Sequence, residues 1–188
     1  MEYSVSTLKT NTIQAATGTT LNVASGHKIN GASGSIVIPG LVIQTISVTG
    51  TTQGSTTSTA PTELGVAAAI TPQFATSKIA VWMGVTCRWP HGDAGFLALH
   101  RKIGGGSYSS VKQFSRHTCY RNHDTSSTHG QFINFNYLDS PNTTSAITYQ
   151  LQWAIQGSQT AYINQSHASS DADRGRTAST LTAMEVAA

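Results

Sequence analysis

Residues 146–155 read AITYQLQWAI, and the alternation within this stretch decides the fold class. Apolar side chains take every second position and hydroxyl or amide side chains lie between them: Ile147, Tyr149, Leu151, Trp153 and Ile155 against Thr148, Gln150 and Gln152. A period of two predicts a β-strand with one buried face and one polar face. We therefore expect Tyr149, Leu151 and Trp153 to be packing residues.

Eight further segments have the same character, and turn-forming residues separate them at roughly eight- to twelve-residue spacing. Their predicted ranges are 41–48, 64–70, 78–89, 96–103, 108–114, 131–138, 161–163 and 181–186. Residues 104–106 (GGG) indicate a hairpin, whereas residues 49–62, rich in Thr and Ser, are expected to form a loop. The pattern predicts an all-β protein. The number of strands and the apolar closing run favour an antiparallel jelly-roll-like β-sandwich.

Pro39-Gly40 divides the chain into two regions of different composition. Residues 41–188 hold the predicted sandwich, while residues 1–40 contain short β-like pieces separated by glycines. Each piece is too short and too weakly apolar to fold alone, so region 1–40 is expected to be an extended segment that docks or intertwines. Its large apolar side chains are the predicted docking residues: Leu8, Ile13, Leu21, Val23 and Ile29.

Charged residues make up only 10% of the chain, and the formal net charge is +3. The basic side chains are scattered along the sequence, so we expect no nucleic-acid surface. No apolar run approaches the roughly 18 residues of a membrane span, and we expect no export signal. Cys87 and Cys119 are interpreted as two buried thiols in a protein assembled in a reducing cytoplasm, although a bond between them stays open.

Several stretches resemble virion structural proteins of cyanophages and other marine-type phages. They are residues 6–14 (STLKTNTIQ) with the Thr- and Gly-rich 21–40, 70–72 (ITP), 76–79 (TSKI), 137–145 (YLDSPNTTS), 161–164 (AYIN) and 176–185 (RTASTLTAME). The resemblance implies a virion protein whose C-terminal jelly-roll domain is similar in architecture to tumour-necrosis-factor and complement-type trimers. It implies a homotrimer, in which Tyr149, Leu151 and Trp153 would pack in the core or near the trimer axis. Residues 88–130 depart from the shared pattern.

The segment 117–129 holds the strongest candidates for metal ligands. His117, Cys119 and His123 carry nitrogen and sulfur donors of the kind that zinc uses, with Asp124 and His129 nearby. Their spacing matches no established zinc signature, and the surrounding Asn, Ser and Thr indicate a polar loop with incidental histidines. The loop is the favoured interpretation, so we expect no metal and no cofactor.

Aromatic and histidine side chains in loops could bind a sugar by stacking. The residues to consider are Trp89, His91, Tyr108 and Tyr120. The stretch 89–93 (WPHGD) lacks a GxSxG nucleophile motif, and a connection between strands with Trp89 packing at its base explains it better. A small β-sandwich enzyme is the least favoured alternative, because no group of titratable residues is seen to converge.

Two roles on the particle surface stay open. The first is capsid decoration (cement), in which the trimer binds the major capsid protein or another virion protein and stabilises the head. The second is a fibre or appendage tip that recognises host surface polysaccharide. Both place the protein on the virion, after assembly in the host cytoplasm, with function in its surfaces rather than in an active site. Capsid decoration is the preferred hypothesis.

Overall fold

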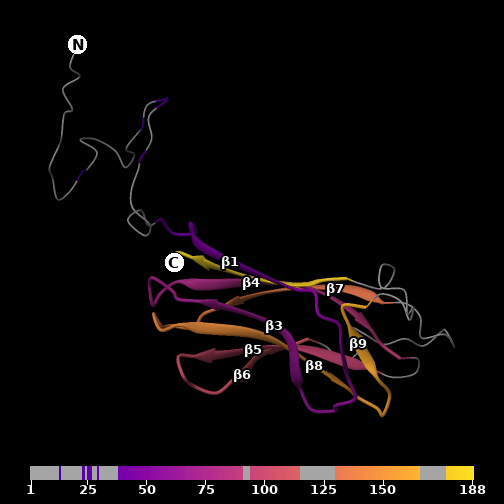
Figure 1. Cartoon of the computed structure of the whole chain (residues 1–188). Coiled ribbons are helices and arrows are strands. Elements are labelled where there is room, and N and C mark those ends of the chain that lie inside the picture. The colour runs from indigo at the N-terminus through magenta and orange to yellow at the C-terminus, as the bar shows by residue number, and fades with distance from the viewer. Residues whose placement is uncertain are drawn as a thin grey trace.

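The computed structural model describes residues 38–90, 94–114, 130–165 and 177–188, together with five single positions nearer the N-terminus: 13, 23, 25, 26 and 29. The regular structure within these ranges is entirely β-strand, which confirms the all-β prediction. Figure 1 shows the strands stacked in two layers. No helix in the described part of the chain is long and apolar enough to cross a membrane.

The two layers are antiparallel sheets. Sheet A contains, in spatial order, β1 (Val42–Gly50), β10 (Ser179–Val186), β4 (Lys78–Arg88) and β7 (Gln131–Asp139), and it is extended at one end by β9 (Ala161–Ile163) and β2 (Gly54–Thr56). Sheet B contains β3 (Thr62–Ile70), β8 (Ile147–Ile155), β5 (Gly95–Ile103) and β6 (Ser109–Gln113).

The long strands pair in a nested pattern. β1 pairs with β10, β3 with β8, β4 with β7 and β5 with β6, so the chain behaves as one long hairpin folded across two sheets. Eight strands connected in this way form a jelly roll. The predicted jelly-roll-like β-sandwich is therefore confirmed. The chain also enters and leaves the sandwich at one end, where the Gly40 amide donates to the Ala187 carbonyl at 2.8 Å.

The core lies between the sheets, because each sheet turns its alternating apolar positions inward. On β4 the inward residues are buried, as the alternation predicts: Ile79, Val81, Met83, Val85 and Cys87. Tyr149, Leu151 and Trp153 of β8 are buried in the same core. These three side chains are thus enclosed within one chain, and a second copy would not reach them.

Buried carboxylates join segments that are distant in the sequence. Asp139, at the end of β7, accepts hydrogen bonds from the Arg101 guanidinium at 2.5 Å and from the Tyr149 hydroxyl at 2.7 Å, and so links the two sheets. Glu185 of β10 is fully buried and accepts hydrogen bonds from Gln44 and from two backbone amides of the β3–β4 connection. A carboxylate is tolerated in a core only with such partners.

The expectation of a loop over residues 49–62 is wrong in part, because strands occupy some of these residues. β1 continues to Gly50, and residues 54–56 form β2. The sequence of β2, Gly-Ser-Thr, has no alternating apolar pattern. Its backbone pairs with β9 instead, and this pairing holds it in sheet A without any side-chain signal.

Candidate functional site

The outward surface of sheet A is built from alternate positions of its four long strands. The strand registers align these positions in three rows: Thr49, Thr180, Gly84 and Asn134; Ser47, Thr182, Trp82 and Asn136; Thr45, Met184, Ala80 and Leu138. Thr86 and Phe132 form a further pair beyond the first row. We call these residues the outer face. Hydroxyl and amide side chains make up most of it.

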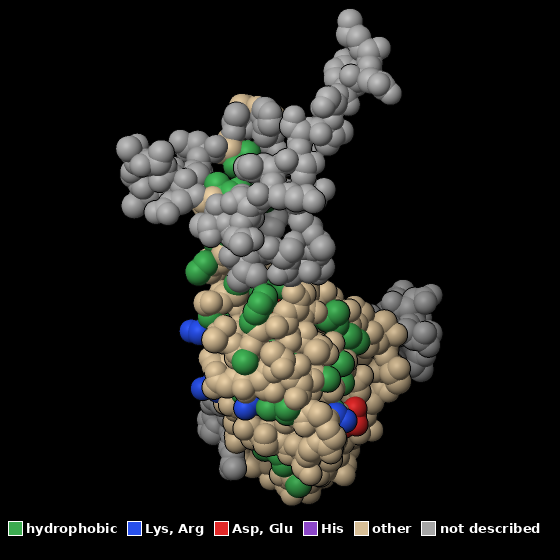
Figure 2. Space-filling view, turned by 90° about the vertical axis from the view of Figure 1, so that its left-hand side faces the viewer, with side chains coloured by type: hydrophobic (Ala, Val, Ile, Leu, Met, Phe, Trp, Pro, Cys, Tyr) green, Lys and Arg blue, Asp and Glu red, His purple; other side chains and the backbone are tan. Residues whose placement is uncertain are grey.

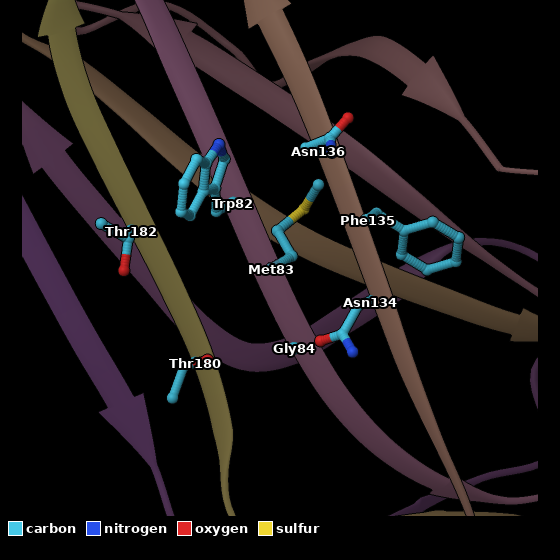
Figure 3. A pocket seen from close by; sticks show the side chains of 8 residues that line it. All are labelled: Trp82, Met83, Gly84, Asn134, Phe135, Asn136, Thr180 and Thr182. Carbon is cyan, nitrogen blue, oxygen red and sulfur yellow. The ribbon is translucent and has the colours of Figure 1, made fainter.

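A hollow of about 400 Å³ opens on the outer face where Gly84 leaves β4 without a side chain. A Cβ atom at this position would lie 3.0 Å from Phe132 Cζ, 3.1 Å from Asn134 Oδ1 and 3.2 Å from Thr180 Oγ1. Figure 3 shows Asn134 and Thr180 on either side of Gly84, with Trp82 and Asn136 further along the same strands. Glycine inside a strand often marks a place where another group approaches the backbone closely.

The polar groups around the hollow are not engaged within the described part of the chain. The Asn134 and Asn136 amides and the Thr180 hydroxyl make no side-chain hydrogen bond to a described residue, whereas the Thr182 hydroxyl lies 2.8 Å from that of Ser47. Each primary amide offers two N–H donors and one carbonyl acceptor. The hollow therefore presents free donors and acceptors to solvent.

Two aromatic rings are exposed on the outer face. Trp82 is 59% exposed and Phe132 is 64% exposed. The other two tryptophans of the chain, Trp89 and Trp153, are each 2% exposed, and their rings pack edge to face with centroids 6.2 Å apart. Trp82 and Phe132 lie on neighbouring strands, four residues apart in register, so each exposes a separate apolar surface on the outer face.

Among the described residues of the outer face, charge occurs only beyond its two ends, at Lys78 and Arg88. The Arg88 guanidinium lies 3.9 Å from the centroid of the Tyr162 ring and donates to Gln165 Oε1 at 3.2 Å, so it is already occupied. Figure 2 shows a different side of the molecule, the end of the sandwich where the chain enters and leaves, and there scattered Lys and Arg side chains and an acidic one lie among mostly uncharged side chains. The hollow is electrically neutral in the described structure.

The predicted ligand residues occupy different settings. Trp89 is buried, with its ring against Gly95, so it packs at the base of its loop and does not face solvent. Tyr108 is partly exposed, and the Lys102 ammonium lies 5.0 Å from the centroid of its ring. His91 and Tyr120 lie outside the described residues. Of the four, Trp89 and Tyr108 are therefore the two that the structure describes.

The predicted metal ligands His117, Cys119 and His123 also lie outside the described residues. Within the described ranges, no three His, Cys, Asp or Glu side chains are grouped so that they could hold a metal ion. Cys87 is buried in β4, and its relation to Cys119 falls outside what the structure describes.

Three of the predicted docking residues are described. Ile13, Val23 and Ile29 are each at least half exposed, while Leu8 and Leu21 lie outside the described residues. Exposed apolar side chains continue to the point where the chain enters sheet A, at Ile38, Leu41 and Val42.

Among the described residues, two ionisable side chains have pKa values shifted by their surroundings, and neither lies on the outer face. Burial, and next the hydrogen bond to Asp139, raise the pKa of Tyr149 far above its usual 10.0, so the phenol stays protonated and keeps donating. Burial lowers the pKa of His100, on the outward side of sheet B, below its usual 6.5. These groups do not form an acid–base pair in one cavity.

A second hollow of about 400 Å³ lies where β2 and β9 face β3 and β8. Its described lining consists of backbone, hydroxyl, amide and apolar groups, and Glu63 is the sole ionisable residue in that lining. General acid–base catalysis requires positioned groups that exchange protons with the substrate, usually more than one. This hollow does not provide such a set.

Sequence reasoning did not identify the outer face as a candidate site. The residues of the site were visible in two predicted strands. Trp82 and Gly84 occupy outward positions of 78–89. Phe132, Asn134 and Asn136 occupy outward positions of 131–138. Each strand alone has an ordinary polar side. The site depends on the register of β7 on β4, which places Asn134 beside Gly84 and Asn136 beside Trp82.

No protein-family model matches the chain, and no curated protein matches it. Among solved structures, it is similar to infectious bursal disease virus Gx strain, at 14% identity over 86% of this chain and 43% of that chain, with a TM-score of 0.37. It is also similar to the VP2 subviral particle of that virus, at 14% identity over 77% of this chain and 37% of that chain, with a TM-score of 0.39. The chain spans less than half of each. Superpositions this loose do not establish a relationship.

Proposed function

We propose that this chain is a non-enzymatic structural protein of a phage particle, that it acts as a homotrimer, and that its role is capsid decoration. The phage setting and the trimer rest on the sequence resemblance. The observation that carries the proposal is the series of exposed apolar side chains before and at the start of β1.

These side chains need a partner surface. Ile13, Val23, Ile29, Ile38, Leu41 and Val42 are between 40 and 69% exposed, although apolar side chains of the sandwich are mostly buried. Burying apolar surface stabilises an association by about 25 cal/mol for each Å². We propose that these residues bind the major capsid protein or another virion protein, or neighbouring copies of the chain.

The attachment would lie at one end of the sandwich. Leu41 and Val42 lie beside the last residues of the chain, where the Ala187 amide donates to the Leu41 carbonyl at 2.9 Å. The opposite end of sheet A, with Phe132 and the Gly84 hollow, would then face away from the attachment. A fibre or appendage tip that binds host polysaccharide is the second candidate, and the neutral hollow on the outer face favours it.

Cryo-electron microscopy of the intact particle, with symmetry-expanded averaging, tests the role. Capsid decoration predicts many copies at local threefold positions of the shell, with residues 1–42 lying on capsid subunits. A few trimers at the tail or at a single vertex would contradict it.

The oligomeric state is measured on the full-length protein by native mass spectrometry. We expect a trimer, and a monomer at micromolar concentration would contradict that part of the proposal. Leu41→Ser together with Val42→Ser is expected to weaken binding to isolated capsids, while Thr45→Ala, on the exposed side of β1, serves as the matched control.

A further inference from the structure

We infer that the hollow at Gly84 binds a neutral saccharide, with one sugar ring stacked on Trp82 and its hydroxyl groups hydrogen-bonded by Asn134 and Asn136. This binding activity goes beyond the proposed structural role and does not require it. Gly84 is six residues along β4 from Lys78, a distance of about 20 Å, so the site would stay open while the other end of the sheet is attached.

The electrostatics of the hollow select an uncharged ligand. The described residues that border it carry amides, hydroxyls and aromatic rings but no ionised group. An anionic or cationic ligand would lose hydration here without gaining an opposite charge. A sugar hydroxyl can donate and accept, as the unengaged amides of Asn134 and Asn136 can, so the two chemistries match.

The aromatic side chains supply the second part of saccharide recognition. An aromatic ring carries partial negative charge on its face, and the C–H groups on one side of a pyranose carry partial positive charge. Trp82 is exposed and lines the hollow, and the exposed ring of Phe132 lies next to Gly84, with Cζ 3.0 Å from where a Cβ atom would be. Figure 3 shows the indole of Trp82 and the Asn136 amide at one end of the hollow and Asn134 at the other.

The shape and composition favour a small polar ligand over a second copy of the chain. The volume of about 400 Å³ lies within the range of small-molecule pockets, roughly 300–1,000 Å³. The polar groups that line the hollow belong to asparagine and threonine, at Asn134, Asn136, Thr180 and Thr182. A protein partner would have to satisfy each of these groups separately, whereas a sugar carries several hydroxyl groups close together.

Intrinsic tryptophan fluorescence can report on ligand binding at this site. The chain has three tryptophans, of which Trp89 and Trp153 are buried and Trp82 is exposed. Quenching of the intrinsic fluorescence by acrylamide therefore reports chiefly on Trp82. The full-length protein is titrated with neutral oligosaccharides of glucose, galactose or mannose, two to six units long, and with sialyllactose as the charged comparator. We expect at least one neutral oligosaccharide to protect Trp82 from acrylamide and to shift its emission to shorter wavelength.

Isothermal titration calorimetry then compares variants with that oligosaccharide. Trp82→Ala should weaken binding roughly tenfold or more, since it removes the stacking surface. Asn134→Ala should weaken it about three- to tenfold through a lost hydrogen bond. Gly84→Ala should weaken binding strongly, because the new methyl group would lie 3.0–3.2 Å from the Phe132, Asn134 and Thr180 side chains and displace them, and thermal denaturation checks that this variant is folded. Leu138→Ala, on the same face two rows away from Gly84, is the control and should bind as the wild type does.

Three results would overturn the inference. The first is the absence of protection of Trp82 by every neutral oligosaccharide, and the second is stronger binding of sialyllactose than of the neutral oligosaccharides. The third is a change in oligomeric state caused by both Trp82→Ala and Leu138→Ala, which would identify the outer face as a contact between copies. The capsid location and the trimer are measured separately, so a failure of the structural role would leave the saccharide result standing, and the reverse also holds.

Discussion

At the residue scale, Asp139 concentrates the polar interactions that hold the two sheets in register. It accepts hydrogen bonds from Arg101 and Tyr149 of sheet B while its own strand belongs to sheet A, and its second oxygen accepts the Ser140 amide at 2.9 Å. The salt bridge to Arg101 is partly shielded from water, so it is screened less than a surface pair. Arg101 and Tyr149 donate to the same carboxylate oxygen, so removing either donor leaves that buried acceptor with one hydrogen bond fewer.

Tyr149→Phe should lower the free energy of unfolding by about 1.5–3 kcal/mol, because the lost hydrogen bond reaches a buried carboxylate that also pairs with Arg101. Urea denaturation followed by circular dichroism measures the change. Tyr137→Phe is the matched control, since the Tyr137 hydroxyl makes no hydrogen bond to a described residue, and it should change the free energy of unfolding little. Equal effects of the two variants would mean that the Asp139 interactions do not stabilise the fold.

His100 should make the protein less stable in mild acid. Its folded-state pKa lies below 6.5 because burial disfavours the imidazolium, so the unfolded chain takes up the proton first as pH falls. The contribution of neutral His100 to the free energy of unfolding is therefore complete above pH 6.5, and it decreases as the pH falls below that value. Comparing melting temperatures of the wild type and His100→Gln from pH 7 to pH 5 isolates this contribution. The variant should lose less, and parallel curves would exclude His100 as the cause.

At the element scale, strand alternation predicted most of this structure, because a strand buried on one side must repeat its apolar residues with a period of two. β8 and β4 follow that rule closely, and their inward residues were identified from the sequence. β2 was missed because it is held by backbone pairing alone, and the candidate site was missed because it arises from the register of β7 on β4. Register depends on contacts between distant strands, which no single stretch of sequence encodes.

The beginning of β5 gives a prediction at this scale. A Cβ atom at Gly95 would lie 1.9 Å from Trp89 Cζ3, so the buried indole occupies the space that any side chain would need. Gly95→Ala should destabilise the protein by about 1–3 kcal/mol or more through overpacking. Gly105→Ala, in the β5–β6 turn where nothing lies within 4 Å, should be nearly neutral. Thermal denaturation compares the two, and an unchanged melting temperature for Gly95→Ala would mean that Trp89 can move away freely.

At the scale of the whole molecule, the nested pairing makes the last strand central. β10 lies between β1 and β4 in sheet A and contributes Leu181 and Ala183 to the core. Deleting residues 179–188 should therefore abolish the fold, seen as loss of protease resistance and of the β-type circular dichroism spectrum. A circular permutant that joins Ala188 to Leu41 by a short linker and opens the chain at Gly105 keeps every strand pair, so it should fold. A folded deletion variant would contradict the central role of β10.

The nested pairing also determines when sheet A can be completed during translation. β1 is synthesised early, and its partner β10 follows about 130 residues later, so at about 5–20 residues per second the two are separated by roughly 7 to 26 seconds of translation. Throughout that interval sheet A lacks the strand that joins its halves. The apolar inner side of sheet A therefore stays partly uncovered until β10 is made, and a chain truncated before β10 would keep that surface exposed.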